Sequence, residues 1–235
     1  YTMDPAEKSR ADLAIEAYAD KCISSYDGPD DDYEKVKYVY EYIIYNTEYD
    51  LDSENNQNIV SVFKDGRSVC QGYAKATQYL LNRMGVFCTI FEGVVKGTER
   101  HAWNIVRVND RYYHVDTTWG DASYNLVTEE EEADFESPRI NYDYLLVPDD
   151  VISDTHVIDS VIPAPPCYSM DDNYYVREGI YFTSLNPDQI AFAFANARAR
   201  GDGVVTLKCS DSGIYAILFD YLINDNKIFD YMNGG

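Results

Sequence analysis

Histidine is scarce in this chain of 235 residues, which contains only three: His101, His114 and His156. Basic residues are also few, since 19 Lys and Arg stand against 41 Asp and Glu, for a formal net charge of -22. Such a charge repels nucleic-acid phosphates and anionic lipid headgroups, which argues against a nucleic-acid partner. The same field would attract a cationic protein or a polyamine, although an acidic surface is more often an aid to solubility.

Long apolar runs are absent as well. No stretch reaches the roughly 20 residues of a membrane-spanning helix, and no charged-then-apolar leader precedes the first segment. The chain is long enough for a globular core, and its size favours one domain plus an appendage or two small domains. It begins at Tyr1 rather than Met, as expected of a trimmed chain or of a secreted or cell-surface protein whose leader has been removed. Neither the localisation nor the oligomeric state follows from the sequence.

The five cysteines are odd in number and widely spaced, with no Cys-x-x-Cys pair and no Cys/His cluster. We therefore expect no structural zinc site, and no other metal or cofactor. Cys88 and Cys209 lie in apolar, strand-like runs, where a cysteine is usually a small buried hydrophobe. The acidic segment 129–136 lacks the alternating ligand spacing of a calcium loop and is expected to be a solvated loop.

Hydrophobic periodicity predicts two helices, at 33–48 and 70–84. Three β-rich runs follow, at 86–95, 101–108 and 111–119. The dipeptide at 109–110, Asn-Asp, is typical of a hairpin turn between the last two runs. The order of helix, helix and antiparallel strands predicts an α+β fold.

The proline-rich run 161–167 is the best candidate for a domain boundary. We expect an N-terminal helical lead-in at 1–32, a core at 33–160 and a small C-terminal α/β subdomain at 165–235. Within that subdomain the pattern predicts strand, helix, strand, helix and strand, at 174–179, 187–201, 204–209, 213–223 and 227–232.

Cys70 lies at the start of the second predicted helix, in the segment GRSVCQGYA. The first turn of a helix presents unpaired backbone N–H groups and the positive end of the helix dipole, and both stabilise a thiolate. A nucleophilic thiol also needs a base to take its proton and a third group to orient that base. With three histidines in the chain, few residues are available as the base.

A two-residue turn at 109–110 sets a hairpin register in which His101 faces Thr118 and Trp103 faces Asp116. His101 and Asp116 are then diagonal neighbours on one face of the sheet, at a Cα separation of about 7–8 Å, which an imidazole and a carboxylate can bridge. A three-residue loop would instead turn Asp116 to the opposite face. His114 shares the Asp116 face nearer the turn and is expected to be a packed or surface residue.

The segments GRSVCQGYA, HAWNIV and RYYHVDTTW resemble the cysteine, histidine and aspartate motifs of the transglutaminase-like superfamily, in the same order. YIIYNTEYD and YDYLLVPDDVISDTH are similar to segments of its bacterial members, so the resemblance covers residues 33–158. It implies a papain-like core, with the cysteine helix packed on an antiparallel sheet, and acyl transfer through a thioester. By position, it makes Cys70 the nucleophile, His101 the general base and acid, and Asp116 the orienting carboxylate.

Other residues have less definite roles. An oxyanion hole would use the Cys70 backbone N–H and a second donor; Tyr49 is a candidate, because family members often supply an aromatic side chain. Gln71 resembles the family's helix start and is expected to shape the site. Trp103 is either an aromatic wall of the site or a core residue. His156 is expected to be a structural hydrogen-bonding residue near the site rather than a catalytic one.

Two functions remain open. The first is a thiol-dependent acyltransferase or hydrolase acting on protein or peptide amides, that is, a transglutaminase, a deamidase or a cysteine peptidase. The second is a non-catalytic binding module on the same fold. The complete set of Cys, His and Asp favours the enzyme, because a binding module has no need to keep all three. The motifs do not choose between an amine and water as the acyl acceptor.

Overall fold

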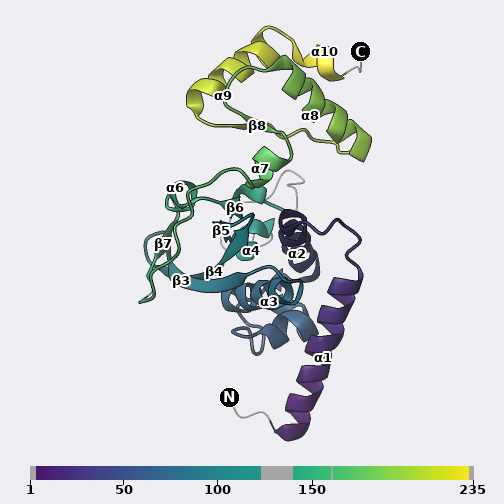
Figure 1. Ribbon diagram of the computed structural model, residues 1–235, viewed down its shortest axis with the longest axis vertical. Coiled ribbons are helices and arrows are strands. Elements are labelled where there is room, and N and C mark those ends of the chain that lie inside the picture. The colour runs from purple at the N-terminus through teal and green to yellow at the C-terminus, as the bar shows by residue number, and fades with distance from the viewer. Residues whose placement is uncertain (1–3, 123–139, 160, 233–235) are drawn as a thin grey trace. The chain divides into compact units, whose positions relative to one another are not determined.

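The computed structural model describes residues 4–122, 140–159 and 161–232. They fall into two compact units, Tyr1–Asp172 and Asn173–Gly235, whose elements are labelled in Figure 1. The acidic segment expected to form a loop at 129–136 lies outside the described residues. No helix in the described part of the chain combines the length and apolar character needed to cross a bilayer.

Two helices open the first unit. The helix α1 (Pro5–Ser24) begins with a capping box, in which the Asp4 side chain accepts from the Glu7 backbone and the Glu7 side chain accepts from Asp4. The helix α2 (Asp32–Asn46) corresponds to the helix predicted at 33–48. It buries the stripe that the sequence pattern indicated: Val36, Val39, Tyr40, Ile43 and Ile44.

A short connection then leads to the cysteine helix. The strands β1 (Glu48–Tyr49) and β2 (Arg67–Ser68) pair in parallel, and the π-helical turn η1 (Ser61–Asp65) lies between them in the chain. The helix α3 (Cys70–Arg83) follows directly. Gly72 is required in its first turn, because a Cβ at that position would lie 1.8 Å from the Ser68 hydroxyl oxygen.

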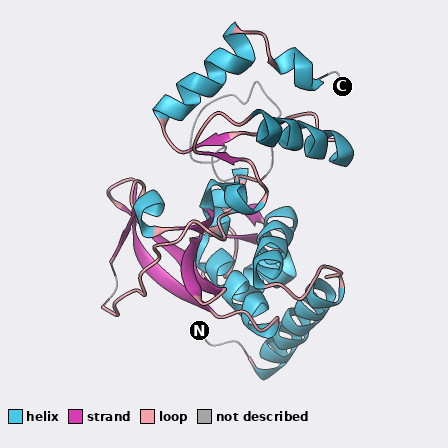
Figure 2. Ribbon diagram, turned by 45° about the horizontal axis from the view of Figure 1, so that its top comes forward, coloured by secondary structure: helices cyan, strands magenta, loops and turns pink. Residues whose placement is uncertain are grey.

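The sheet of the first unit has five strands. They are β3 (Cys88–Val95), β4 (Glu99–Val108), β5 (Arg111–Val115), β6 (Leu145–Val147) and β7 (His156–Ile158). Their order is β6-β5-β4-β3-β7, and every neighbouring pair is antiparallel. The helix α3 packs against β3 and β4, and Asn104 Nδ2 donates to the Ala74 carbonyl across this contact at 3.0 Å. Figure 2 shows the curved sheet beside the longer helices. The α+β fold, with the cysteine helix on an antiparallel sheet, is therefore confirmed.

The predicted hairpin register is present. Val108 pairs with Arg111, and both turn residues, Asn109 and Asp110, have positive φ, at 48° and 64°. Such a turn matches the right-handed twist of the two strands. The pairing continues to Val115, where β5 ends.

The expectation of a strand as far as residue 119 is wrong. Asp116 is the N-cap of a short helix, α4 (Thr117–Gly120), and its side chain accepts from the backbone N–H groups of Thr118 and Trp119. Because these residues are helical, Thr118 does not face His101 across the hairpin. Aspartate is a strong N-cap residue, so its capping preference ends the strand here.

The chain from residue 140 onward stays with the first unit as far as Asp172. It includes the turn η2 (Tyr142–Tyr144) and the helix α6 (Asp149–Ile152). Cys167 is fully buried against Phe91 and Ile105. Asp172 accepts hydrogen bonds from Tyr113 Oη at 3.0 Å and from Asn109 Nδ2 at 2.8 Å. Residues 165–172, which we expected to open the C-terminal subdomain, thus pack with the sheet.

The second unit has a small core made of Phe182, Ile190, Leu218 and Leu222. Its elements are α7 (Tyr174–Arg177), β8 (Tyr181–Phe182), α8 (Pro187–Arg200), β9 (Lys208–Cys209), α9 (Ser212–Phe219), η3 (Asp220–Asn224) and α10 (Ile228–Met232). The strands β8 and β9 pair in parallel. The helices expected at 187–201 and 213–223 are present as α8 and as α9 continued by η3.

The strands expected at 174–179 and 227–232 are wrong, because both segments contain helices. The side chain of Asn173 caps α7 by accepting from the Tyr175 backbone N–H. In α10, Ile228 and Tyr231 pack against the unit's core, and their spacing of three residues suits a helix.

These contacts predict where the chain can be shortened. A chain that ends after Asp172 should unfold in urea with a first-unit stability close to that of the full chain. A chain that ends after Pro163 loses the buried Cys167 and the two hydrogen bonds to Asp172, and should be less stable by roughly 3 kcal/mol. Equal stability of the two shortened chains would contradict the assignment of 165–172 to the first unit.

Candidate active site

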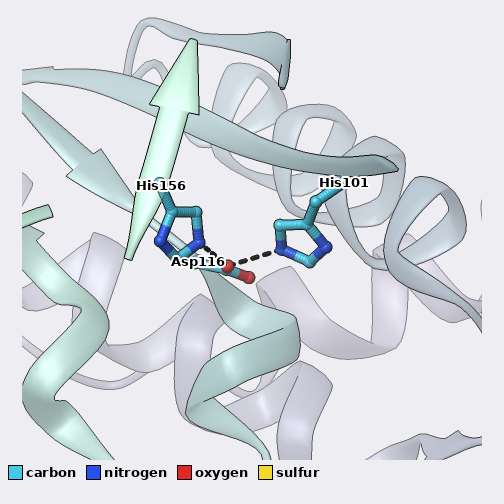
Figure 3. A group of neighbouring side chains, drawn as sticks. All are labelled: His101, Asp116 and His156. Carbon is cyan, nitrogen blue, oxygen red and sulfur yellow. Dashed lines mark hydrogen bonds and ion pairs between the residues drawn. The ribbon is translucent and has the colours of Figure 1, made fainter. Parts of the chain in front are cut away.

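The carboxylate of Asp116 lies at the centre of a buried polar cluster and is itself fully buried. Its Oδ1 accepts from the backbone N–H groups of Thr118 at 3.0 Å and Trp119 at 3.2 Å. Its Oδ2 accepts from His101 Nε2 at 2.6 Å and from His156 Nε2 at 2.9 Å. Figure 3 shows the two imidazoles pointing at this carboxylate from opposite sides. Four donors therefore satisfy a charge that would otherwise be costly to bury.

The His101–Asp116 pair is held in its charged form. Burial lowers the pKa of His101, but the charge of Asp116 and the hydrogen bond to it outweigh burial and raise that pKa to about 10. Burial raises the pKa of Asp116, but the charge of His101 and the hydrogen bonds from both histidines hold it well below its usual range. At neutral pH, the pair is thus an imidazolium and a carboxylate.

Cys70 is the first residue of α3 and is partly exposed. Since His101 directs its Nε2 at Asp116, Nδ1 is the nitrogen left for another partner. A side-chain hydrogen bond with Cys70 and the charge of Cys70 both contribute to the raised pKa of His101. The three residues come from different elements: Cys70 from α3, His101 from β4 and Asp116 from the N-cap of α4.

Three other residues were expected to shape the site. Gln71 donates from Nε2 to Glu92 Oε1 at 2.6 Å, so its amide is held by β3. Tyr49 packs against a cluster formed by Val95 and Trp119. The role of Tyr49 as an oxyanion donor stays a prediction.

Trp103 is 1% exposed, which favours a core residue over an aromatic wall. Its ring lies 6.1 Å from that of His101 and 5.0 Å from that of His156, measured between centroids. Its Nε1 donates to His114 Nδ1 at 3.0 Å. Trp103 thus packs behind the polar cluster and holds it in place rather than lining it for a substrate.

His114 is fully buried and forms a second histidine–carboxylate pair, in which its Nε2 lies 2.9 Å from Asp149 Oδ1. Burial lowers the pKa of His114, and the hydrogen bond to Asp149 only partly opposes this. The backbone N–H of Cys167 donates to the other oxygen of Asp149 at 2.9 Å. His114 is therefore a packed residue that ties β5 to the segment leading to Asp172.

Two groups of side chains in the described part of the chain bring ligand-type atoms within 4.8 Å of one another: His101, Asp116 and His156, and His114, Asp149 and Cys167. In the second group, His114 Nδ1 accepts from the Trp103 indole, so the proton of a neutral imidazole is on Nε2, which faces Asp149. A protonated Nε2 cannot ligate a metal ion. Hydrogen bonding accounts for this grouping.

His156 is buried, as expected of a structural hydrogen-bonding residue, but its partner was not predicted. It reaches Asp116 from β7, a strand separated from β5 by the whole segment 116–155. No local pattern in the sequence connects these two residues. Two signals in the sequence point to His156: it is one of three histidines, and it ends the segment YDYLLVPDDVISDTH, which resembles bacterial members of the superfamily.

Comparison with known proteins agrees with this geometry. Residues 17–117 match the family model described as the Transglutaminase-like superfamily, a segment that includes Cys70, His101 and Asp116. Over these residues the chain is similar to the transglutaminase-like superfamily. The matched segment ends before His156, which shares the Asp116 carboxylate, and before Asp149, the partner of His114.

Two curated relatives are kyphoscoliosis peptidases from mouse and human, each 26% identical over 113 residues. The match covers 41% of this chain and 17% of the relatives' length. Among solved structures, a TGase is 16% identical to this chain, with a TM-score of 0.40. The match covers 50% of this chain and 34% of the TGase chain. A candidate cysteine protease from Cytophaga hutchinsonii is 15% identical, with a TM-score of 0.39. That match covers 69% of this chain and 56% of the protease chain.

The thiols predict a simple chemical test. Burial raises the pKa of Cys22 and of Cys167 to about 12, and it also raises the pKa of Cys88 and Cys209. Cys70 is partly exposed at a helix start beside the His101 imidazolium. A short, limiting pulse of iodoacetamide near neutral pH should therefore modify Cys70 first, as read by peptide mapping.

Cys209 is the internal control, because it is also partly exposed. Labelling of Cys209 ahead of Cys70 would mean that exposure, and not the surroundings of Cys70, sets the order of reaction.

The raised pKa of His101 predicts a pH-dependent stability. The folded value of about 10 lies above the unfolded value near 6.5, so the stabilisation is complete below about pH 6.5 and is lost as pH rises towards 10. The difference in unfolding free energy between the wild type and His101→Gln should fall over that window by on the order of 3 kcal/mol, as measured by urea unfolding. The control His114→Gln should show no such loss, because burial lowers the pKa of His114.

Proposed function

We propose that this chain is a thiol-dependent acyl-transfer enzyme that acts on protein or peptide amides. In this proposal Cys70 is the nucleophile, His101 the general base and acid, and Asp116 the orienting carboxylate. The observation that carries it is the buried 2.6 Å hydrogen bond between His101 Nε2 and Asp116 Oδ2, beside a cysteine at the start of a helix. The match of residues 17–117 to a superfamily that includes cysteine proteases and transglutaminases supports the same class of reaction.

The first half of the reaction forms the thioester. The Cys70 thiolate attacks the amide carbonyl carbon, a C–S bond forms, and the carbonyl electrons move to oxygen. When the tetrahedral intermediate collapses, the C–N bond breaks and the His101 imidazolium gives its Nδ1 proton to the departing amine. A charged His101 is suited to this step, because it holds the proton that the leaving group needs.

The second half regenerates the enzyme. The acceptor, an amine or water, attacks the thioester carbonyl while His101 Nδ1 takes a proton from it. The C–S bond then breaks and the thiolate leaves. Throughout both halves Asp116 stays ionised, keeps the His101 proton on Nε2 and stabilises the imidazolium each time it forms. Its complete burial and four donors suit that constant role.

The tetrahedral intermediates need donors for the oxyanion. The backbone N–H of Cys70 is at the N-terminus of α3, where N–H groups have no partner within the helix. A second donor from β1, with Tyr49 as the candidate, remains part of the proposal. The net charge of -22 would favour a cationic protein or peptide as the substrate or as the amine acceptor.

One experiment identifies the acceptor. The protein is incubated with a library of glutamine-containing peptides, with and without a primary amine, and the products are read by mass spectrometry. Amine adducts indicate transglutaminase activity, a gain of about 1 Da indicates deamidation to the acid, and shortened peptides indicate proteolysis. No product under any condition, with a folded protein and a reactive Cys70, would support a binding module instead.

The role of Asp116 predicts the effect of removing its charge. Asp116→Asn should lower acyl transfer by about 10³–10⁴-fold, because an amide neither holds the correct His101 tautomer nor stabilises the imidazolium. It should also slow Cys70 alkylation. The measurements are initial rates on the best peptide of the library and on iodoacetamide.

Asp149→Asn is a matched control. Asp149, like Asp116, accepts from a histidine Nε2 and from backbone N–H, so the same substitution disturbs the same kinds of bond away from Cys70. Its rates should stay close to those of the wild type. Comparable losses in both variants would mean that the effect is on folding, and would remove the support for Asp116 as a member of a triad.

A further inference from the structure

His156 has two hydrogen-bond partners and both of its ring nitrogens are used. Its Nδ1 lies 2.7 Å from the Thr155 hydroxyl oxygen, and its Nε2 lies 2.9 Å from Asp116 Oδ2. The carboxylate can only accept, so Nε2 carries a proton, and the Thr155 hydroxyl can then donate to Nδ1. The bond to Asp116 itself therefore requires the form of His156 that carries a proton on Nε2.

The surroundings of His156 hold its ring in one orientation. Its side chain is buried, and its ring lies 5.0 Å from Trp103, 4.7 Å from Trp119 and 5.9 Å from Tyr144, between centroids. These three aromatic side chains come from β4, α4 and η2. A ring enclosed in this way cannot turn away from the carboxylate without moving its neighbours.

The backbone of β7 comes close to β3, which brings His156 within reach of Asp116. His156 pairs with Val95, and Ile158 pairs with Gly93. A Cβ on Gly93 would lie 2.1 Å from the Val157 carbonyl oxygen and 2.7 Å from the Trp103 ring. Only glycine allows this approach. The edge strand β7 therefore pairs closely with β3 beside the polar cluster.

We propose that His156 is a positioning residue of this active site, which acts through Asp116 by fixing Oδ2 of the carboxylate toward His101. The inference rests on the proposed function for its effect on catalysis. Oδ1 is already held by the N–H groups of α4. Without His156, Oδ2 would have a single partner, His101, and a cavity on its other side. The carboxylate and His101 could then shift together, and Nδ1 would lose its alignment with Cys70.

This arrangement predicts different effects for two substitutions. His156→Leu removes the donor and keeps an apolar side chain in the aromatic enclosure. His156→Gln keeps a donor, since the amide nitrogen of glutamine reaches the position of Nε2. The leucine variant should lower kcat and the rate of Cys70 alkylation by about 10–100-fold with KM little changed, because alignment is lost and not substrate binding. The glutamine variant should recover to within about threefold of the wild type.

The experiment uses the full chain and three readouts. The first is the initial rate of Cys70 alkylation under limiting iodoacetamide, and the second is the split between kcat and KM on a glutamine peptide. The third is the downfield proton signal of His101 Nε2–H in the NMR spectrum, which reports the hydrogen bond to Asp116 whether or not the protein turns over. It should be present in the wild type and in His156→Gln and be lost or shifted in His156→Leu.

Two outcomes overturn the proposal. One is a folded His156→Leu variant with wild-type alkylation and an unchanged His101 signal. The other is a His156→Gln variant that is as impaired as His156→Leu. If the leucine variant does not fold, His156→Asn replaces it, because an asparagine amide is too short to reach Asp116. The predicted NMR and alkylation results without any acyl transfer would refute the proposed function and leave the positioning role intact.

Discussion

The structure of the first unit depends on one buried charge. The carboxylate of Asp116 is fully enclosed and has four donors, two from the backbone of α4 and one each from β4 and β7. An ionised carboxylate without these partners would be costly to bury, so the donors have to be in place together. The donors to Oδ1 lie where β5 ends at Val115 and α4 starts at Thr117, and the donor from His156 comes from the edge strand β7, which pairs with β3.

A second histidine–carboxylate pair, formed by His114 and Asp149, is linked to the first through Trp103. The indole N–H donates to His114, and the same ring is stacked with the imidazole of His101 and makes a T-shaped contact with that of His156. The pKa of the histidine is shifted in opposite directions in the two pairs. The pKa of His101 is raised by its carboxylate, whereas that of His114 is lowered by burial. One histidine is suited to carry a proton in a reaction, and the other to join parts of the fold.

The family match and the site do not have the same extent. The matched residues, 17–117, contain the cysteine, the histidine and the aspartate that resemble the family's motifs. His156, which shares the carboxylate of Asp116, lies outside that segment, as does Asp149. The residues proposed to react therefore lie in the part of the chain that matches the family model, whereas the hydrogen-bond partners His156 and Asp149 lie beyond it.

Several structural features of this protein could be predicted from its sequence, because they depend on interactions between neighbouring residues. The helix start at Cys70, the hairpin turn at 109–110 and the buried stripe of α2 follow from capping, turn and periodicity rules that act over a few residues. The predicted pairing of Asp116 with His101 is present, although Asp116 lies at the N-cap of a helix and not in a longer strand. The bond from His156 to Asp116 was decided only by the tertiary structure, because it joins residues 40 apart that share no local pattern. The helix at 228–232 was decided in the same way, by packing on a core, since a segment of five residues is too short for its own periodicity to choose its conformation. The helix at 174–177 instead begins at a local cap, Asn173, which the sequence analysis missed.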